Sequence, residues 1–504
     1  MPASGRILNP LLASRVVSAD EAAALVPPGA NIGMSGFTGA GYPKAVPQAL
    51  ARRIGEAHAR GEGFRIGLWT GASTGPELDG ALAAVDGIEM RLPFQSDPTL
   101  RKLINSGRMH FTDMHLSHVA QQAWFGFLGR IDTAVVEVAG VLPDGRLIPS
   151  SSIGNNKTWL DQAERIILEV NGWFSDGFEG MHDVYYGTRL PPHRVPIPLV
   201  GAGDRIGEPY LRCDLPKVVA VVETHQPDRN NAFATPDAVS RAIAGHIIDF
   251  LQHEVAHGRL PARTLLPIQS GVGNVANAVL AGLNEGPFEG MSAYTEVLQD
   301  GMLAMLDKGT LAQASATALS LSQPVAERFN ADAATYRDRI VLRPQEISNH
   351  PEVIRRLGTI AMNAMIEADI YGNVNSTHVM GSSIMNGIGG SGDFARNAYL
   401  SIFVTPSVAK DGAISCIVPF ASHVDNTEHD VQVIVTEQGL ADLRGLSPRQ
   451  RAQCIIERCA HPDYRPALRD YVARAALHAP GQHTPHLLDE AFSWHTRYLR
   501  EGHM

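Results

Sequence analysis

The chain has 504 residues, and 42 Lys+Arg against 52 Asp+Glu give it a formal net charge of −10. This length allows two or three domains, and 19% charged beside 44% hydrophobic residues excludes a disordered chain. An acidic total without a basic block argues against a nucleic-acid or membrane-surface protein, because such partners need clustered positive charge. An anionic ligand would have to be held by local groups.

The cysteines and the first residues indicate the cellular environment. The four cysteines form no C-x-x-C pair, so we predict reduced thiols and neither a zinc ribbon nor a disulfide framework. No apolar stretch approaches the roughly 18 residues of a transmembrane helix, and MPASGRILNP lacks the features of a signal peptide. We therefore expect a cytoplasmic protein.

Short apolar runs followed by glycine-rich turns and helical patterns recur along the chain. This rhythm is typical of βα units around a mainly parallel sheet. A strand and a glycine loop open each half of the chain in the same order, so we predict an α/β protein of two similar, open, mainly parallel-sheet domains with the ligand site in the groove between them. The predicted strands are Ala30–Ser35, Phe64–Trp69, Asp132–Val138 and Leu265–Gln269.

The best domain boundary lies in ETHQPDRNNAFATPD, between Glu223 and Asp237, which has no periodic apolar pattern. We predict domains at 1–228 and 229–504. Beyond the boundary, Thr235 can cap a helix that has Pro236 at its first position and ends before Gly258.

Several segments resemble catalytic or metal motifs without the context that such motifs require. HEVAH, residues 253–257, matches the zinc-protease pattern but ends a helix and has no third ligand. GIGGSG, residues 387–392, follows no buried strand, so it predicts a loop whose backbone must approach another group closely and not a dinucleotide site. HVDNTEHD, residues 423–430, and the group of His110, His115 and His118 are interpreted as polar surface segments. We expect no metal site.

One constellation indicates acyl-group chemistry. Glu296, in the predicted strand segment Ala293–Leu298 ahead of a glycine turn, is a carboxylate that can face a cleft. Backbone amides of Gly271 to Val275 open a helix and can meet phosphates or an acyl group. With Asn349 and Lys410 downstream, this set could handle an acyl thioester, as one possibility among several.

Seven longer blocks resemble the acetyl-CoA hydrolase/transferase family, and most closely its bacterial succinyl-CoA:acetate CoA-transferases. The resemblance runs from about Val17 to Trp494. The blocks are SGFTGAGYPKAVP, GVGNVANAV, YTEVLQDG, EISNHPEVIRRLG, DIYGNVNSTHV, MNGIGGSGDFARNA and SHVDNTEHDV with VTEQGLADLRGL.

This resemblance implies a class I CoA-transferase in which a glutamate, here Glu296, attacks the thioester and carries CoA as a glutamyl thioester. It implies Asn349 as a positioning group and the Gly390 N–H as an oxyanion donor. The implied CoA-binding residues are Gly271, Val272, Gly273, Asn274, Val275, Asn386, Gly390 and Lys410. We expect no cofactor beside the CoA thioester substrates, small carboxylic acids as the other substrates, and a homodimer.

Arg229 is the candidate that binds the acceptor carboxylate, and an exposed linker arginine is the alternative. The alternatives for the activity are an acetyl-CoA hydrolase, a propionyl-CoA:succinate CoA-transferase, a non-catalytic ligand sensor on the same fold and, more distantly, a zinc peptidase.

Overall fold

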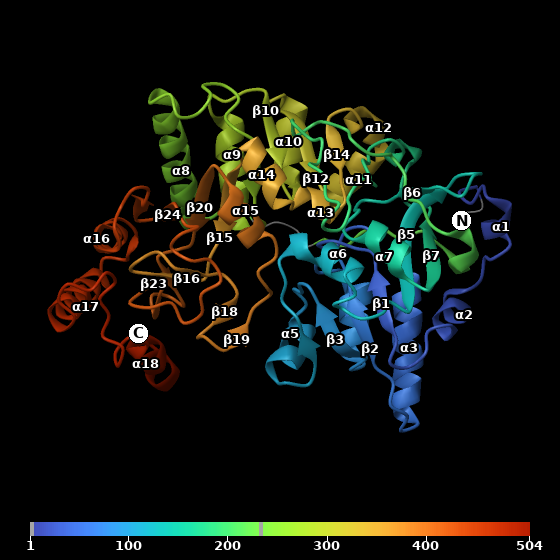
Figure 1. The fold of residues 1–504 in the computed structure, drawn as a ribbon, viewed down its shortest axis with the longest axis horizontal. Coiled ribbons are helices and arrows are strands. Elements are labelled where there is room, and N and C mark those ends of the chain that lie inside the picture. Colours follow the sequence, from blue (N-terminus) through green and yellow to red (C-terminus); the bar gives the residue numbers. More distant parts are fainter. Residues whose placement is uncertain (1–4, 231–234) are drawn as a thin grey trace. The chain divides into compact units, whose positions relative to one another are not determined.

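The computed structural model describes residues 5–230 and 235–504, which form two compact units (Figure 1). Unit 1 comprises Met1–Ala232, Ser292–Leu306 and Leu311–Leu357, and unit 2 comprises Phe233–Met291, Asp307–Thr310 and Gly358–Met504. Residues 231–234 of the predicted linker lie outside the described residues. Each unit combines three separate stretches of the chain and is defined by its internal contacts. The division into two consecutive domains, 1–228 and 229–504, therefore stays a prediction.

Unit 1 contains a sheet whose strands are parallel except for β6, which pairs antiparallel with β5. Its order is β4-β3-β2-β1-β5-β7-β8, so the chain builds outward in both directions from the β1/β5 pair. That pair is a topological switch point, where loops after neighbouring strands diverge and leave room for a site. The strands are β1 (Asn31–Met34), β2 (Ile66–Trp69), β3 (Ile88–Leu92), β4 (His110–Phe111), β5 (Thr133–Val141), β6 (Leu147–Pro149), β7 (Arg165–Asn171) and β8 (Val218–Thr224).

Helices cover this sheet and connect its strands. Local chemistry explains where several begin: Ser18 and Glu21 form a capping box at α2, and Asp97 caps α5 ahead of a proline. The helices of this part are α1 (Pro10–Ala13), α2 (Ala19–Ala24), α3 (Ala45–Ala59), a π-helical turn (Pro76–Gly80), α4 (Ala81–Ala84), α5 (Pro98–Asn105), α6 (Leu116–Trp124), α7 (Asn156–Gln162) and short 3₁₀ turns at Asp176–Phe178 and Leu215–Lys217.

The later segments of unit 1 add further parallel strands. β12 pairs with β14, and β11 pairs with β13. The strands are β10 (Met291–Tyr294, whose first residue is counted with unit 2), β11 (Val297–Gln299), β12 (Leu311–Ala316), β13 (Ala318–Ser320) and β14 (Ile340–Leu342). The helices are α10 (Asp300–Lys308), α11 (Gln323–Ala331), α12 (Ala333–Tyr336), α13 (Gln345–Ser348) and α14 (Pro351–Leu357).

Unit 2 is built on the strands β9-β15-β20-β24-β25, which are parallel except for the last pair. These strands are β9 (Ile268–Ser270), β15 (Ile360–Ala364), β20 (Leu400–Val404), β24 (Val433–Thr436) and β25 (Gly439–Asp442). Short pairings make up the rest: β16 (Glu367–Asp369) with β17 (Val374–Asn375) and β23 (Ile417–Val418), β18 (His378–Val379) with β19 (Ser383–Ile384), and β21 (Val408–Ala409) with β22 (Ile414–Ser415).

The helices of unit 2 include the long pair α8 and α9, which pack on one another (Figure 1). The predicted cap of α8 is wrong: Asp237, not Thr235, accepts the N–H of Ser240 at 2.7 Å, so the helix begins at Ala238 and Pro236 precedes it. The helices are α8 (Ala238–Ala256), α9 (Asn274–Glu285), α15 (Ser391–Asn397), α16 (Pro448–Cys459), α17 (Arg465–His478) and α18 (Ser493–Glu501).

Each unit buries a hydrophobic core of its own. In unit 1 the core joins α2 and α3 to the sheet, and in unit 2 it joins β24 and β25 to α16 and α17. The α/β class with mostly parallel sheets is therefore confirmed. Within the described residues, no helix has the length and apolarity needed to cross a bilayer.

Candidate functional site

Glu296 lies in unit 1, in a two-residue break between β10 and β11. Its backbone oxygen accepts hydrogen bonds from the N–H groups of Thr317 (2.9 Å) and Ala318 (3.2 Å), and Thr317 is itself a one-residue break between β12 and β13. The predicted continuous strand Ala293–Leu298 and its glycine turn are thus wrong in detail, because this double contact interrupts the regular ladder and Gly301 already lies inside α10. The break leaves the Glu296 side chain partly exposed between buried strands.

Asn349 holds the Glu296 carboxylate. The Asn349 Nδ2 donates to Oε1 at 2.8 Å, and the Ser348 hydroxyl donates to the Asn349 Oδ1 at 2.8 Å. Because this hydroxyl occupies the amide oxygen, the NH₂ group must face the carboxylate. Asn349 and Ser348 are fully buried. This contact brings together two residues that were expected in one site, and their roles stay a prediction.

Helix α13 carries Asn349 at its C-terminal end and is fixed by long-range contacts. The Gln345 Nε2 donates to the Leu116 backbone oxygen at 3.0 Å, and the Tyr294 hydroxyl donates to the backbone oxygen of Ile347. Tyr294 precedes Glu296 by two residues. The strand that carries the carboxylate therefore also anchors the helix that carries its amide partner.

Burial raises the pKa of Glu296 to about 7, and the hydrogen bond from Asn349 opposes this rise. A carboxyl group with such a pKa is ionised in part at neutral pH and is less well solvated than a surface carboxylate. Perturbed carboxyl groups at the end of a strand are typical of functional sites. Chemically, Glu296 can act as a nucleophile or as a base.

A glycine loop after β1, residues 36–41, lies near both Glu296 and Arg229. Phe37 and Ala40 share an apolar cluster with Val297 and Ala318, which flank Glu296 and its backbone partner. At Gly39 the backbone φ is 77°, and a Cβ would lie 2.8 Å from the Arg229 backbone oxygen. The loop can make this approach because it has no side chain there.

Arg229 is exposed and forms an ion pair through Nε with the Glu77 Oε1 at 2.8 Å. Glu77 is almost fully buried, and its other oxygen accepts the Tyr42 hydroxyl at 2.7 Å. Glu77 and Tyr42 were not among the residues predicted from the sequence. Tyr42 stands in the quoted block SGFTGAGYPKAVP, which was the available signal for it, whereas Glu77 lies in no recognised motif.

In unit 2 the predicted CoA-binding residues 271–275 lie where β9 leads into α9: residues 271–273 form the turn, and Asn274 and Val275 begin the helix. Residues 271–275 line a pocket of about 270 Å³ together with residues at the carboxyl ends of β15 and β20, such as Ala364 and Val404. Gly273 caps α9 with φ 131°, a conformation that a residue with a Cβ rarely adopts. The backbone amides at this helix start suit an anionic ligand.

The remaining predicted residues also lie in unit 2. Gly390 is the N-cap of α15, Asn386 lies four residues earlier, and Lys410 is exposed in the turn between β21 and β22. The structure thus groups Glu296, Asn349 and Arg229 in unit 1, and it groups the predicted CoA-binding residues in unit 2. GIGGSG follows only the two-residue strand β19, in agreement with its interpretation as a loop.

The segments that resembled metal motifs have structural partners. Glu254 of HEVAH is buried and accepts from Arg259 (2.6 Å) and Arg444 (2.8 Å). Asp425 of HVDNTEHD accepts from Ser376 and Thr377. No group of three or more His, Cys, Asp or Glu in the described part of the chain is placed to hold a metal ion, and its four cysteines form no disulfide.

Comparison with known proteins agrees with the family resemblance. The model of the acetyl-CoA hydrolase/transferase N-terminal domain matches residues 12–223, and the model of the C-terminal domain matches residues 327–472. A succinyl-CoA:acetate CoA-transferase of Clostridium kluyveri is 50% identical over 99% of this chain and 92% of its own. A propanoyl-CoA:succinate CoA transferase of Escherichia coli is 47% identical (97% and 98%), and so is an acetyl-CoA hydrolase of Schizosaccharomyces pombe (99% and 98%).

Solved structures share the fold at low identity. RipA from Yersinia pestis has a TM-score of 0.70 at 23% identity and covers 92% of this chain and 98% of its own. A 4-hydroxybutyrate CoA-transferase from Porphyromonas gingivalis has a TM-score of 0.62 at 22% identity, with the same coverage. These structures establish the fold alone.

Proposed function

Because the chain belongs to the acetyl-CoA hydrolase/transferase family, whose enzymes act on acyl-CoA and carboxylate substrates, we propose that it transfers CoA from succinyl-CoA to acetate. The observation that carries this proposal is the Glu296 carboxylate, held at 2.8 Å by the buried Asn349 amide in a strand break. The similarity to the Clostridium kluyveri enzyme supports the choice of substrates.

In the proposed cycle, a Glu296 oxygen attacks the succinyl-CoA carbonyl, and the C–S bond breaks to give a succinyl-glutamyl anhydride and CoA thiolate. The thiolate attacks the glutamyl carbonyl, which releases succinate and leaves a glutamyl-CoA thioester. Acetate then attacks this thioester to give an acetyl-glutamyl anhydride and thiolate. Attack of the thiolate on the acetyl carbonyl forms acetyl-CoA and restores Glu296. Thioester energy stays in covalent bonds, so the cycle requires no cofactor beside the CoA substrates.

The other residues receive roles by the same proposal. Asn349 orients Glu296, and the Gly390 N–H at the start of α15 stabilises the charge that develops on the carbonyl oxygen. Residues 271–275, Asn386 and Lys410 bind CoA, and Arg229 binds the acceptor carboxylate through a bidentate pair. We further propose that the enzyme is cytoplasmic and forms a homodimer. Light scattering of the purified protein tests the homodimer.

An acetyl-CoA hydrolase is the second candidate, and the name of the Schizosaccharomyces pombe relative favours it. It differs in one step, since water instead of a carboxylate resolves the glutamyl-CoA thioester. A propionyl-CoA:succinate CoA-transferase differs only in the acyl group. A pocket distinguishes acids that differ by one methylene by about 1–3 kcal/mol.

The deciding experiment supplies succinyl-CoA with and without a panel of acids that includes acetate and propionate. We expect acetyl-CoA to form only with acetate and free thiol to stay low. Thiol release at the same rate without any acid would refute transfer and support the hydrolase. Mass spectrometry after incubation with acyl-CoA should find CoA attached to the peptide that contains Glu296. A Glu296→Ala protein with full turnover would refute the mechanism and leave a ligand sensor or another chemistry.

A further inference from the structure

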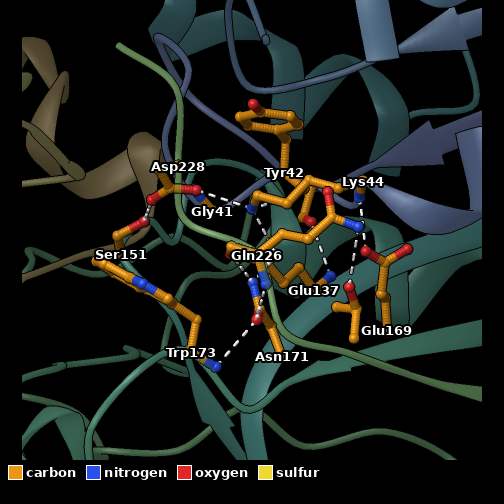
Figure 2. Close-up of polar contacts among 12 residues, drawn as sticks. Gly41, Tyr42, Lys44, Glu137, Ser151, Glu169, Asn171, Trp173, Gln226 and Asp228 are labelled. Carbon is orange, nitrogen blue, oxygen red and sulfur yellow. Dashed lines mark hydrogen bonds and ion pairs between the residues drawn. The ribbon is translucent and has the colours of Figure 1, made fainter. Parts of the chain in front are cut away.

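A buried ion cluster lies at the switch point of the unit 1 sheet (Figure 2). We call Lys44, Glu137 and Asp228 the Lys44 cluster. The Lys44 ammonium donates to the Glu137 Oε2 at 2.6 Å, to the Asp228 Oδ1 at 2.8 Å and to the Tyr42 backbone oxygen at 2.8 Å. An ammonium has three donors, so this geometry uses each of them. The side chains of Lys44 and Glu137 are inaccessible to solvent.

A buried ion cluster contributes little net stability to a fold. Taking charges out of water costs several kcal/mol per ion, and apolar side chains of the same volume often serve as well or better. Two carboxylates face one ammonium here, and Glu169, which accepts the N–H groups of Lys44, Ala45 and Val46, adds a third carboxylate nearby. Because desolvating these charges is unfavourable, we infer that the cluster is retained to fix the position of the segments that it joins.

One of these segments is 226–230. The Asp228 Oδ1 accepts from the Lys44 ammonium and also from the Gly41 N–H at 3.1 Å. The other oxygen of Asp228 accepts the Ser151 hydroxyl. Asn171 pairs with Gln226 in both directions, accepting its N–H at 3.1 Å and donating to its oxygen at 2.7 Å. Figure 2 shows these contacts converging on the segment from several elements.

Arg229 lies between two anchored residues of this segment. Asp228 is fixed by the cluster on one side, and on the other side the Asn230 Oδ1 accepts the Ser320 hydroxyl at 3.1 Å. Arg229 itself is 66% exposed in its side chain and engages Glu77 through Nε. An arginine held through Nε can present its two terminal nitrogens to a carboxylate as a fork. Its backbone is therefore fixed while its end remains accessible.

The segment that follows β1 orients Glu77, the ion-pair partner of Arg229. Tyr42, whose backbone oxygen binds the Lys44 ammonium, donates its hydroxyl to Glu77. Lys44 thus constrains Arg229 by two routes. Through Asp228 it fixes the backbone next to Arg229, and through Tyr42 and Glu77 it orients the Arg229 side chain.

The cluster is connected to the backbone of Glu296 within unit 1. Ser151, which donates to Asp228, accepts the Leu319 N–H at 2.9 Å, and Ser152 pairs with Ala318. The Ala318 N–H in turn donates to the Glu296 backbone oxygen. One set of contacts therefore sets the position of Arg229 relative to Glu296.

We propose that Lys44, with Glu137 and Asp228, is a positioning residue for the acceptor site: it holds Arg229 where a small carboxylic acid can reach the side-chain carbonyl of Glu296 in the glutamyl-CoA thioester. This inference rests on the proposed function, and it adds residues that do not touch the substrate. It predicts a defect in acceptor use and not a general loss of activity.

The test compares two variants. Asp228→Asn keeps the shape of Asp228 and one of its two acceptor oxygens but removes its charge, and the pair Lys44→Met/Glu137→Gln removes the ammonium together with one of the carboxyl groups that it contacts. In steady-state transfer assays with varied acetate and varied acyl-CoA, we expect the KM for acetate to rise about 10- to 100-fold, as small displacements of binding groups do. The KM for acyl-CoA should stay within about twofold, because CoA is assigned to unit 2. Two variants are used because either one could fail to fold.

A double-mutant cycle separates positioning from simple destabilisation. Arg229→Ala should raise the KM for acetate by a similar factor, and adding Asp228→Asn to Arg229→Ala should raise it no further. The matched control is Arg444→Met in unit 2, which removes an ion pair to the buried Glu254 without touching segment 226–230. It should lower the melting temperature and leave the KM for acetate unchanged.

The outcomes are distinguishable. If the wild-type enzyme shows no acceptor-dependent transfer, the proposed function fails and the inference falls with it. If transfer occurs but the cluster variants raise both KM values equally, or if their effects add to that of Arg229→Ala, the proposed function stands and the positioning role is overturned. Cluster variants that only melt earlier, with kinetics like those of Arg444→Met, overturn it as well.

Discussion

Burial and a hydrogen bond from Asn349 act in opposite directions on the pKa of Glu296. The Ser348 hydroxyl occupies the Asn349 amide oxygen, so the amide N–H group favours the ionised carboxylate, while burial favours the neutral form. Burial dominates, and the pKa lies at about 7. The YTEVLQDG and EISNHPE blocks were enough to predict both Glu296 and Asn349. Only the folded structure shows the hydrogen bond between Asn349 and Glu296, because 53 residues separate them in the chain.

The first prediction is a pH dependence. In the proposed mechanism Glu296 attacks as the ionised carboxylate, so kcat/KM for acyl-CoA should be flat above about pH 7 and fall about tenfold per pH unit below it. Asn349→Ala removes the hydrogen bond that lowers this pKa, so the acidic limb should move to higher pH by about one unit. A profile that stays flat down to pH 5.5, or a limb that does not move in the variant, would contradict this assignment.

Replacement of Glu296 itself should separate activity from stability. Glu296→Gln keeps the acceptor for Asn349 and should abolish transfer. A carboxyl group whose pKa is raised on folding favours the folded state at low pH, and this contribution is lost as the pH rises from about 4.5 to about 7. The variant should therefore gain stability relative to wild type at pH 8 by on the order of 1–3 kcal/mol, a range lowered by the partial exposure of the side chain, and gain much less at pH 4. Urea unfolding at both pH values measures the difference, and an equal difference at both would contradict burial as the cause.

At the scale of elements, the turn between β9 and α9 depends on one glycine. Gly273→Ala meets no steric contact, but its φ of 131° costs a residue with a Cβ about 1–3 kcal/mol. The turn should change shape and raise the KM for acyl-CoA about tenfold, with the KM for acetate unchanged. The matched control is Gly258→Ala at the end of α8, where φ is 68° and space is equally open. If both variants change the KM for acyl-CoA alike, the turn has no special role.

The end of α8 gives a prediction about HEVAH. The Arg259 hydrogen bond and the Arg444 ion pair lower the pKa of Glu254 to about 2. Glu254→Gln should therefore lower the free energy of unfolding by on the order of 1 kcal/mol, because the side chains of Arg259 and Arg444 are 41% and 28% exposed and water screens their charges. This contribution exists above pH 4.5 and disappears as the pH falls towards 2. Transfer activity should survive both the substitution and a chelator, and loss of activity with the chelator would restore the zinc interpretation.

At the scale of the whole molecule, unit 1 is completed by residues that follow the predicted domain boundary. The first sheet lies entirely within residues 31–224, yet Phe178 contacts the ring of Phe329, and Phe37 packs with Val297. A fragment of residues 1–228 should retain strand and helix content, bind a hydrophobic dye and melt below the full chain. A fragment that melts cooperatively at the temperature of the full chain would support the boundary at 228 as one between autonomous domains.

The sequence by itself determined the α/β class, the strands near Ala30, Phe64, Asp132 and Leu265, and the family, because apolar runs and long motif blocks are local patterns. It also predicted Glu296 and Asn349 as site residues, whose roles stay a prediction, and it predicted the glycine loop that leads into a helix at residues 271–275. Only the tertiary structure decided that the strand breaks at Glu296, that Asp237 caps α8, and that Glu254 serves an ion pair. It alone brought Lys44, Glu137 and Asp228 together at the β1/β5 switch point. Buried polar groups find partners far away in the chain, and no local pattern encodes which partner closes each contact.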